Sequence, residues 1–265
     1  MMTRPCVLVF SGADPSGGAG IQADIEAIST LGAHPLSVIT ALTVQDNDRV
    51  FSIHPVPALL VQQQAQALIN KIDISAVKIG IVGNRANAEA IADLINALRL
   101  RQPDLPVVLD PVFASGQGDA LAIDDALQTI GPLLTVATLL TPNLPEAAML
   151  CGGDRRLDTQ VEALLCVCRH VLIKGGHALD DKVTNRWFTE GSSRSWVWPR
   201  LPETFHGSGC TLAAAIAALL ANGHSMMDAI DLAQTYCQQT LETSYAIADG
   251  QRIPNRSVSL LEESV

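Results

Sequence analysis

The fold class is decided by residues 7–32, which read VLVFSGADPSGGAGIQADIEAISTLG. Residues 7–11 form an almost wholly apolar run, which is typical of a strand covered on both faces. A glycine-rich turn follows, and residues 19–31 then have the spacing of a helix that ends at Gly32. This stretch therefore predicts a strand, a tight turn and a helix, which is the first half of a βαβ unit.

The same alternation continues over most of the chain. Five further apolar runs predict strands at residues 36–44, 77–82, 107–112, 137–140 and 171–174. Between them, Asn84 can cap a helix over residues 85–99, and Asp158 can cap a helix that ends at Cys166. Alternation of this kind predicts an α/β protein with a mainly parallel, doubly wound sheet.

The last third of the chain departs from this pattern. It predicts a β-hairpin with strands at residues 186–189 and 195–198 and a Gly-Ser-Ser turn between them. Two long helices are expected to follow, at residues 209–220 and 226 to about 246. Ser225 and Asp228 form a capping box for the second helix. Because no linker or internal repeat interrupts the chain, we expect residues 1–265 to form a single domain with a frayed tail after Gly250.

Composition excludes several classes of protein. The chain has 17 Lys and Arg against 27 Asp and Glu, a net charge of −10, so it repels the phosphate backbone of nucleic acids. Its longest helical apolar run, residues 212–221, covers about half a bilayer. No signal peptide is recognisable at the N-terminus, and the six cysteines form no CxxC pair. We therefore expect a soluble, cytoplasmic protein that binds neither nucleic acid nor membrane.

The first glycine cluster, residues 11–20, occupies the position of a phosphate-binding loop between a strand and a helix. It is not a Walker A motif, because Gly18 stands where that motif needs a lysine, and no dinucleotide GxGxxG fits. An ordinary strand-to-helix turn is one interpretation. The number of glycines favours the other, in which a ligand approaches the backbone closely.

The second cluster, residues 206–211, stands immediately before an apolar helix. Its amides are expected to point along the helix axis, where they can hold an anion or stabilise the charge of a transferring phosphoryl group. A thiol in this position is predicted to have a lowered pKa, which would make Cys210 the reactive cysteine of the six. The alternative is a buried cysteine in the first turn of a helix.

Polar residues also follow three of the predicted strands. Asp110 follows the strand at residues 107–109, and Asn143 and Glu146 follow the one that ends at residue 140. In doubly wound sheets ligands collect at the carboxyl ends of strands, where these carboxylates could hold Mg²⁺. For Glu146 a plain capping box with Asn143 is an equal alternative. Lys174, at a third strand end, could contact a phosphate or could be only solvated.

Seven motifs occur in an order that closely resembles the hydroxymethylpyrimidine/phosphomethylpyrimidine kinases of thiamine biosynthesis, which belong to the ribokinase-like superfamily. The motifs lie at residues 11–24, 40–45, 78–80, 110–112, 141–143, 174–177 and 207–211. The resemblance spans residues 6 to about 247, and it implies a three-layer α/β fold. It also implies ATP-dependent phosphorylation of 4-amino-5-hydroxymethyl-2-methylpyrimidine, first to the monophosphate and then to the diphosphate.

The resemblance further implies roles for individual residues, and a homodimer. The substrate pocket would be lined by Gly12, Asp24, Val44, Gln45 and Ile81. Gln45 would read the aminopyrimidine edge, because its amide supplies both a donor and an acceptor. Mg²⁺ and the phosphates of ATP would be held by Asp110, Glu146, Asn143, Lys174 and Ser208. The anion hole would consist of Gly207, Ser208 and Gly209, with Cys210 orienting or deprotonating the attacking hydroxymethyl group.

Three departures from the family pattern bear on the site. Ile81 replaces a methionine that family members often carry, Phe205 replaces a threonine, and residues 113–118 differ from the usual version. The nearest rival function is that of a pyridoxal kinase, since relatives with the same Gly-x-Gly-Cys turn phosphorylate another heteroaromatic hydroxymethyl compound. A non-catalytic pyrimidine sensor is a third interpretation, which Asp110, Lys174 and Cys210 argue against.

Overall fold

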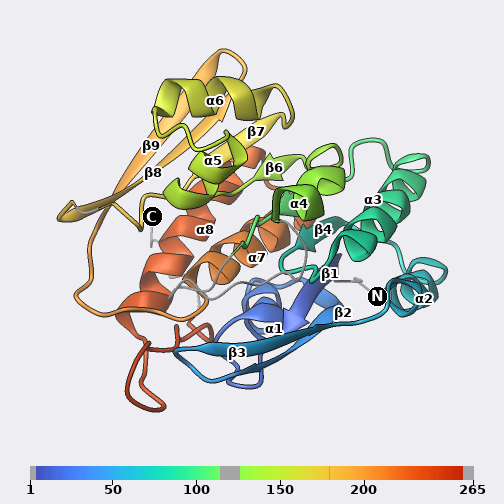
Figure 1. Ribbon diagram of the computed structural model, residues 1–265, viewed down its shortest axis with the longest axis horizontal. Coiled ribbons are helices and arrows are strands. Elements are labelled where there is room, and N and C mark those ends of the chain that lie inside the picture. Colours follow the sequence, from blue (N-terminus) through green and yellow to red (C-terminus); the bar gives the residue numbers. More distant parts are fainter. Residues whose placement is uncertain (1–3, 114–125, 179, 259–265) are drawn as a thin grey trace.

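A single nine-stranded sheet runs through the computed structural model, in the order β3-β2-β1-β4-β5-β6-β7-β8-β9. The structure describes residues 4–113, 126–178 and 180–258. Its strands are β1 (Cys6–Ala13), β2 (His34–Gln45), β3 (Val50–Pro55), β4 (Ala76–Ile79), β5 (Val107–Leu109), β6 (Leu139–Leu140), β7 (His170–Ile173), β8 (Lys182–Thr189) and β9 (Ser192–Pro199). The six central strands pair in parallel, and β3, β8 and β9 join antiparallel at the two ends, as Figure 1 shows.

Eight helices among the described residues cover both faces of this sheet (Figure 1). They are α1 (Gly20–Thr30), α2 (Ala58–Ile69), α3 (Arg85–Arg99), α4 (Ala126–Leu134), α5 (Leu144–Leu150), α6 (Leu157–Leu165), α7 (Ser208–Ala221) and α8 (Met226–Glu242). Alternate residues of β1 supply the two cores: Leu8 and Phe10 pack with α2 and α3, whereas Val7 and Val9 pack with α1, α7 and α8. The central strands β1, β4, β5, β6 and β7 are mostly apolar because both of their faces are buried.

The expected alternation of strands and helices is confirmed, with three local corrections. The hairpin of β8 and β9 turns at Glu190 and Gly191, so the predicted Gly-Ser-Ser turn is wrong. Arg156, and not Asp158, is the N-cap of α6, and Asp158 lies in its first turn. At α8 the Ser225 side chain accepts a hydrogen bond from the amide of Asp228 as expected, but the helix ends at Glu242 rather than near residue 246.

The prediction of a frayed tail after Gly250 is wrong for the described residues up to 258. Gln251, Ile253 and Arg256 are all buried, and the backbone at residues 252–253 pairs with Phe205 and Tyr245. The tail is therefore part of the packed structure, next to the second glycine cluster.

The structure also bears on the expectation about membranes and on the departure from the family pattern at residues 113–118. No helix within the described ranges is both long and apolar enough to cross a membrane. Of the departure noted at residues 113–118, only Phe113 is described, and it is buried in the core; residues 114–118 lie outside the described part of the chain.

Candidate active site

A cavity of about 510 Å³ lies where the two glycine clusters and the carboxyl ends of the central strands meet. Its wall includes eleven of the predicted site residues: Gly12, Gln45, Ile81, Asp110, Asn143, Glu146, Lys174, Gly207, Ser208, Gly209 and Cys210. Strand ends gather at one edge because β1, β4, β5, β6 and β7 run parallel. Motifs that are far apart in the sequence thus share one site.

The two glycine clusters pack directly against each other. Gly207 is the N-cap of α7 with φ of 76°, and a Cβ at this position would collide with the carbonyl oxygen of Gly18. A Cβ on Gly18 would in turn collide with the ring of His206. A ligand near the backbone was one interpretation of the first cluster, but at Gly18 the close neighbour is the ring of His206, and at Gly207 it is the backbone of Gly18.

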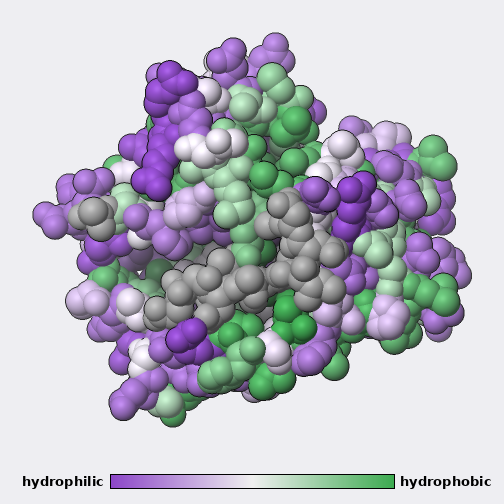
Figure 2. Space-filling model, viewed as in Figure 1, coloured by the Kyte–Doolittle hydropathy of each residue, from purple (hydrophilic) through white to green (hydrophobic). Residues whose placement is uncertain are grey.

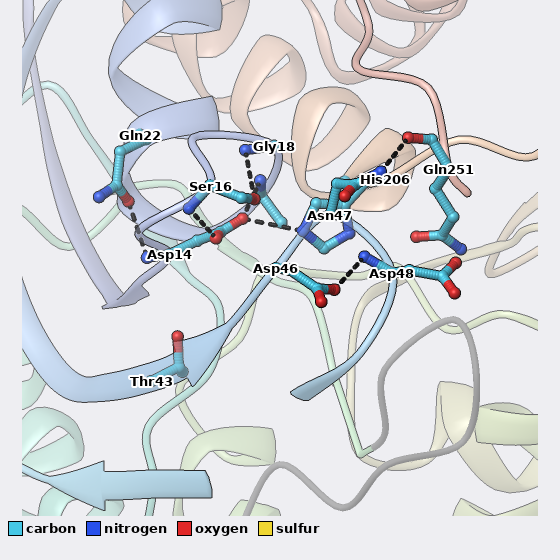
Figure 3. Close-up of polar contacts among 12 residues, drawn as sticks. Asp14, Ser16, Gly18, Gln22, Thr43, Asp46, Asn47, Asp48, His206 and Gln251 are labelled. Carbon is cyan, nitrogen blue, oxygen red and sulfur yellow. Dashed lines mark hydrogen bonds and ion pairs between the residues drawn. The ribbon is translucent and has the colours of Figure 1, made fainter. Parts of the chain in front are cut away.

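A hydrogen bond between His206 and Asp14 joins the same two clusters. Nε2 of His206 lies 2.8 Å from Oδ2 of Asp14, which also accepts a hydrogen bond of 2.7 Å from the amide of Ala19 (Figure 3). Burial alone would raise the pKa of Asp14, but hydrogen bonds from His206, Gln45 and Ser16 hold it well below its usual range. The carboxylate therefore stays ionised at neutral pH and fixes the side chain of Gln45 at the edge of the cavity.

Lys174 and two carboxylates form the charged wall of the cavity. Nζ of Lys174 lies 2.7 Å from Oδ1 of Asp110, which also accepts a hydrogen bond of 3.1 Å from the hydroxyl of Thr141. Burial by itself would lower the pKa of Lys174, but Asp110 and Glu146 raise it, so the ammonium group stays charged. The lysine is not merely solvated, because its side chain is 13% exposed.

Glu146 serves two purposes at once. Its Oε2 accepts a hydrogen bond of 2.7 Å from the amide of Asn143, and its own amide donates to Oδ1 of Asn143 at 2.9 Å, which completes a capping box at α5. Burial raises the pKa of the Glu146 carboxyl to about 7, although Lys174 opposes the shift. The capping box is therefore present, and the same side chain lines the cavity, where a role for Glu146 toward Mg²⁺ stays a prediction.

The start of α7 lies on the charged wall. A Cβ at Gly209 would stand 3.1 Å from Nζ of Lys174 and 3.6 Å from Oδ2 of Asp110. The first amides of α7 have no partners within the helix, and they carry the positive end of its dipole. Positive charge from Lys174 and from the helix therefore converges on one part of the cavity, which suits a polyanion.

Cys210 lines the cavity, but the lowered pKa predicted for it is wrong. Burial raises the pKa of the thiol, the carboxylates of Asp110 and Asp24 add to the shift, and the ammonium of Lys78 only partly opposes it. The cysteine is 8% exposed and its helix is embedded in the core. Desolvation of the thiolate thus outweighs the helix dipole, and the thiol stays protonated at neutral pH.

Two residues predicted for the substrate pocket are not part of the cavity wall. Asp24 is fully buried in α1, with Oδ1 at 2.8 Å from Nζ of Lys78. Burial would lower the pKa of Lys78, but Asp24 raises it, whereas burial raises the pKa of Asp24 itself against the attraction of Lys78. Val44 is 52% exposed on β2, whereas its neighbours Thr43 and Gln45 line the cavity. Alternation along the strand places Val44 on the opposite face.

Sequence reasoning missed several residues of the wall. Asp14 and His206 belong to the two glycine clusters, so a polar side chain within each cluster could have identified them as site residues. Gln251 lies in the tail that was expected to fray, and Asn185, Trp198 and Gln234 come from β8, β9 and α8. Those four residues belong to no motif, and only the tertiary fold brings them to the cavity.

The donors at the strand ends suit a magnesium ion that enters with a nucleotide. Asp110 and Glu146 place two carboxylates on one wall, and oxygen ligands are those that Mg²⁺ prefers. No cluster of three or more potential metal ligands occurs within residues 4–113, 126–178 and 180–258. The donor set therefore fits an ion that takes its remaining ligands from water and phosphate oxygens, not one held by protein alone.

Comparisons with known proteins agree with this geometry. The family model described as phosphomethylpyrimidine kinase matches residues 14–255. A hydroxymethylpyrimidine/phosphomethylpyrimidine kinase of Rhizobium meliloti is 39% identical over 253 residues, which cover 92% of this chain and 93% of the relative. The thiamine biosynthesis multifunctional protein ThiED of Corynebacterium efficiens is 35% identical over 94% of this chain, which spans only 34% of that longer protein.

Solved structures show the same architecture. The pyridoxal kinase from Staphylococcus aureus in complex with AMP-PCP and pyridoxal has a TM-score of 0.85 and 26% identity, over 97% of this chain and 94% of that one. The phosphomethylpyrimidine kinase from Clostridium difficile 630 has a TM-score of 0.74 and 29% identity, over 90% of this chain and all (100%) of that one. The three-layer ribokinase-like fold expected from the motifs is confirmed.

A helix N-terminus beside a largely buried lysine, on one wall of a cavity in this fold, is the arrangement of a phosphotransferase that acts on small molecules. Its motifs and its relatives narrow that class further. The chain belongs to the phosphomethylpyrimidine kinase family, as the sequence predicted.

Proposed function

We propose that this protein transfers the γ-phosphoryl group of ATP to 4-amino-5-hydroxymethyl-2-methylpyrimidine, and then phosphorylates the monophosphate to the diphosphate, in thiamine biosynthesis. One observation carries the proposal: the turn at residues 207–210 lies directly on the Lys174–Asp110 pair. Phosphoryl transfer needs little covalent chemistry from the protein, so converging positive charge and correct positioning account for most of the catalysis.

We assign the nucleotide phosphates to the charged side of the cavity. Lys174, Asn143 and Ser208 would contact them, and Asp110 and Glu146 would hold Mg²⁺, which neutralises phosphate charge when bound. The backbone of Gly207, Ser208 and Gly209 would receive the negative charge that develops on the transferred group. The contact with Lys174 holds the Asp110 carboxylate at the wall where the ion would bind.

We assign the pyrimidine to the side formed by Gly12, Gln45 and Ile81. Gln45 lies close enough to Asp14 to help lower the pKa of that carboxyl, and its amide would read the aminopyrimidine edge. Cys210 lies in the first turn of α7 and lines the same cavity. Since its thiol is protonated at neutral pH, we assign it to orienting the hydroxymethyl oxygen rather than to removing the proton.

A second candidate is phosphorylation of pyridoxal, which the likeness to the Staphylococcus aureus pyridoxal kinase favours. One coupled assay with Mg-ATP separates the two by comparing kcat/KM for the pyrimidine alcohol and for pyridoxal. The proposal predicts the higher kcat/KM for the pyrimidine and a second phosphorylation of its product. A higher kcat/KM for pyridoxal would overturn it, and pyrimidine binding without ADP release would indicate the sensor.

We also propose that the chain works as one domain over residues 1–265, in the cytoplasm and as a homodimer. Leu42, Val44 and Phe51 are 52%, 52% and 66% exposed at the edge of the sheet formed by β2 and β3. Figure 2 shows hydrophobic surface over the part of the molecule where Figure 1 places these strands. Burial of this patch against a second copy would support a dimer. A monomeric mass in sedimentation equilibrium would contradict that.

A further inference from the structure

The segment that follows Gly250 packs against the outside of the two glycine clusters. We call residues 251–256 the C-terminal strap. The side chain of Asn47 donates to the carbonyl oxygen of Gln251 at 3.1 Å, a contact drawn in Figure 3. The amide of His206 donates to the carbonyl oxygen of Arg252 at 2.9 Å, and the amide of Asn255 donates to the carbonyl oxygen of Thr240 at 2.9 Å. The strap is thus bonded to the turn between β2 and β3, to the second glycine cluster and to α8.

Arg256 ends the strap with a fully buried side chain, which is 0% exposed. Its Nε donates to Oγ1 of Thr211 in the first turn of α7 at 2.8 Å, and its Nη2 donates to the carbonyl oxygen of Gly18 in the first glycine cluster. The third arm, Nη1, lies 3.2 Å from Oε2 of Glu26, a side chain that is 49% exposed. One guanidinium group therefore bonds to both of the clusters that form the cavity wall.

The two buried groups that accept hydrogen bonds from Arg256 both contact the turn at residues 207–210, which we call the anion-binding turn. The carbonyl oxygen of Gly18 is the atom that packs against Gly207, and Oγ1 of Thr211 also donates to the carbonyl oxygen of Gly207 at 2.8 Å. The planar guanidinium fork sets the direction and spacing of its acceptors, which a flexible ammonium group does not. Arg256 thereby fixes the position of the turn at residues 207–210 relative to the first cluster.

Stability alone does not account for this arginine. Removing a guanidinium group from water is costly. Among the described residues its charged partner is the half-exposed Glu26, whose attraction is weakened by solvent. An apolar side chain would fill a core at lower cost. The bonds to both clusters supply a reason for burying the charge, because phosphoryl transfer depends on exact placement of the turn.

We propose that Arg256 is a positioning residue for phosphoryl transfer, and that the C-terminal strap is required to hold the anion-binding turn in its active geometry. The inference rests on the proposed kinase function and adds to it a residue far from the catalytic motifs in the sequence. Arg256 acts through the backbone of Gly18 and the hydroxyl of Thr211 and does not touch the reacting groups.

The test compares Arg256→Met with Glu26→Gln, which removes only the exposed arm of the same guanidinium. We expect Arg256→Met to lower kcat by about 10- to 100-fold while both KM values stay within about threefold, because the turn is misplaced but the substrates still bind. Glu26→Gln should keep the kcat of the wild type. In Arg256→Ala, added guanidinium chloride at millimolar concentration should restore part of the lost kcat, since it can occupy the vacated space.

A second pair of variants covers the case in which Arg256→Met does not fold. Thr211→Val removes the hydroxyl that accepts from Nε, and Thr211→Ser keeps it. We expect Thr211→Val to lower kcat and Thr211→Ser to retain it. Hydrogen exchange at the amides of residues 207–210 gives a readout independent of turnover, and it should be faster in Arg256→Met and Thr211→Val than in the wild type.

Several outcomes would overturn the inference. One is an unchanged kcat in folded Arg256→Met, and another is a loss of kcat in Glu26→Gln equal to that in Arg256→Met. A third is a loss of folding in both Arg256→Met and Thr211→Val, which would make the contact purely structural. Failure of the proposed function looks different, because the wild type itself would then release no ADP. Hydrogen exchange at residues 207–210 would still decide whether Arg256 orders the turn.

Discussion

Gly207→Ala should damage both the stability and the catalysis of the enzyme, because this residue has two separate reasons to be glycine. Its φ of 76° lies in the left-handed region, and a Cβ would collide with the carbonyl oxygen of Gly18. The left-handed backbone costs about 1–2 kcal/mol for a residue with a Cβ, and overpacking adds about 1–3 kcal/mol. The expected loss in the free energy of unfolding is therefore about 2–5 kcal/mol.

Gly223→Ala is the matched control, because it isolates the first of these costs. Gly223 has a φ of 90° just after α7, and a Cβ there would meet no atom within 4 Å. Urea denaturation of the two variants should therefore show a loss of only about 1–2 kcal/mol for Gly223→Ala. In an ADP-release assay Gly207→Ala should lose about 100-fold in kcat, since a shift of about 1 Å at the turn is enough, whereas Gly223→Ala should keep its kcat. Equal stability of the two variants together with a normal kcat for Gly207→Ala would refute the reasoning.

Three further predictions concern charged and polar groups of the site. Lys174→Met should lower the free energy of unfolding at pH 7 by about 3–5 kcal/mol, because it leaves a buried carboxylate at Asp110 without its partner. Urea denaturation checks this against Arg85→Met, which breaks an exposed ion pair on a helix. A smaller loss in Lys174→Met than in Arg85→Met would contradict the prediction. Cys210→Ala should lower kcat far more than it raises KM, as steady-state kinetics can show, and an unchanged kcat would remove the thiol from the chemistry. Asp14 has a lowered pKa when folded, so the stability it contributes is present above about pH 4, the usual pKa of an aspartic acid, and is lost as the pH falls below that value. Urea denaturation at pH 6 and pH 3 should therefore show a smaller drop for Asp14→Asn than for the wild type, and equal drops would contradict the assignment.

The central strands could be predicted from sequence because burial on both faces leaves a plain apolar signature. In β1 the residues that face one core, Leu8 and Phe10, alternate with Val7 and Val9, which face the other, so no polar residue interrupts the run. The edge strand β3 (Val50–Pro55) was not predicted, because most of it is partly exposed and its composition is mixed. The tail could not be predicted either, since its burial depends on Gly18, Thr211 and Tyr236, which are distant in sequence.

The site was predictable where a functional group follows a strand within a motif. Asp110 and Lys174 each stand at the end of a parallel strand, so the topology alone brings them together. Asp24 belongs to the same motif as the first glycine cluster, yet its side chain pairs with Lys78 in the interior, a choice that motif spacing cannot reveal. The raised pKa of Cys210 could not be predicted for a similar reason. The position at a helix N-terminus can be read from the sequence, but the depth of burial, which raises the pKa, cannot.

The measurement that tests the central claim most directly is phosphorus NMR of the wild-type enzyme with Mg-ATP and 4-amino-5-hydroxymethyl-2-methylpyrimidine. The proposed function predicts a phosphomonoester signal that appears as ATP is converted to ADP, followed by the paired signals of a pyrimidine diphosphate. A spectrum in which ATP stays intact with the pyrimidine, while pyridoxal in a parallel sample becomes a phosphomonoester, would contradict it.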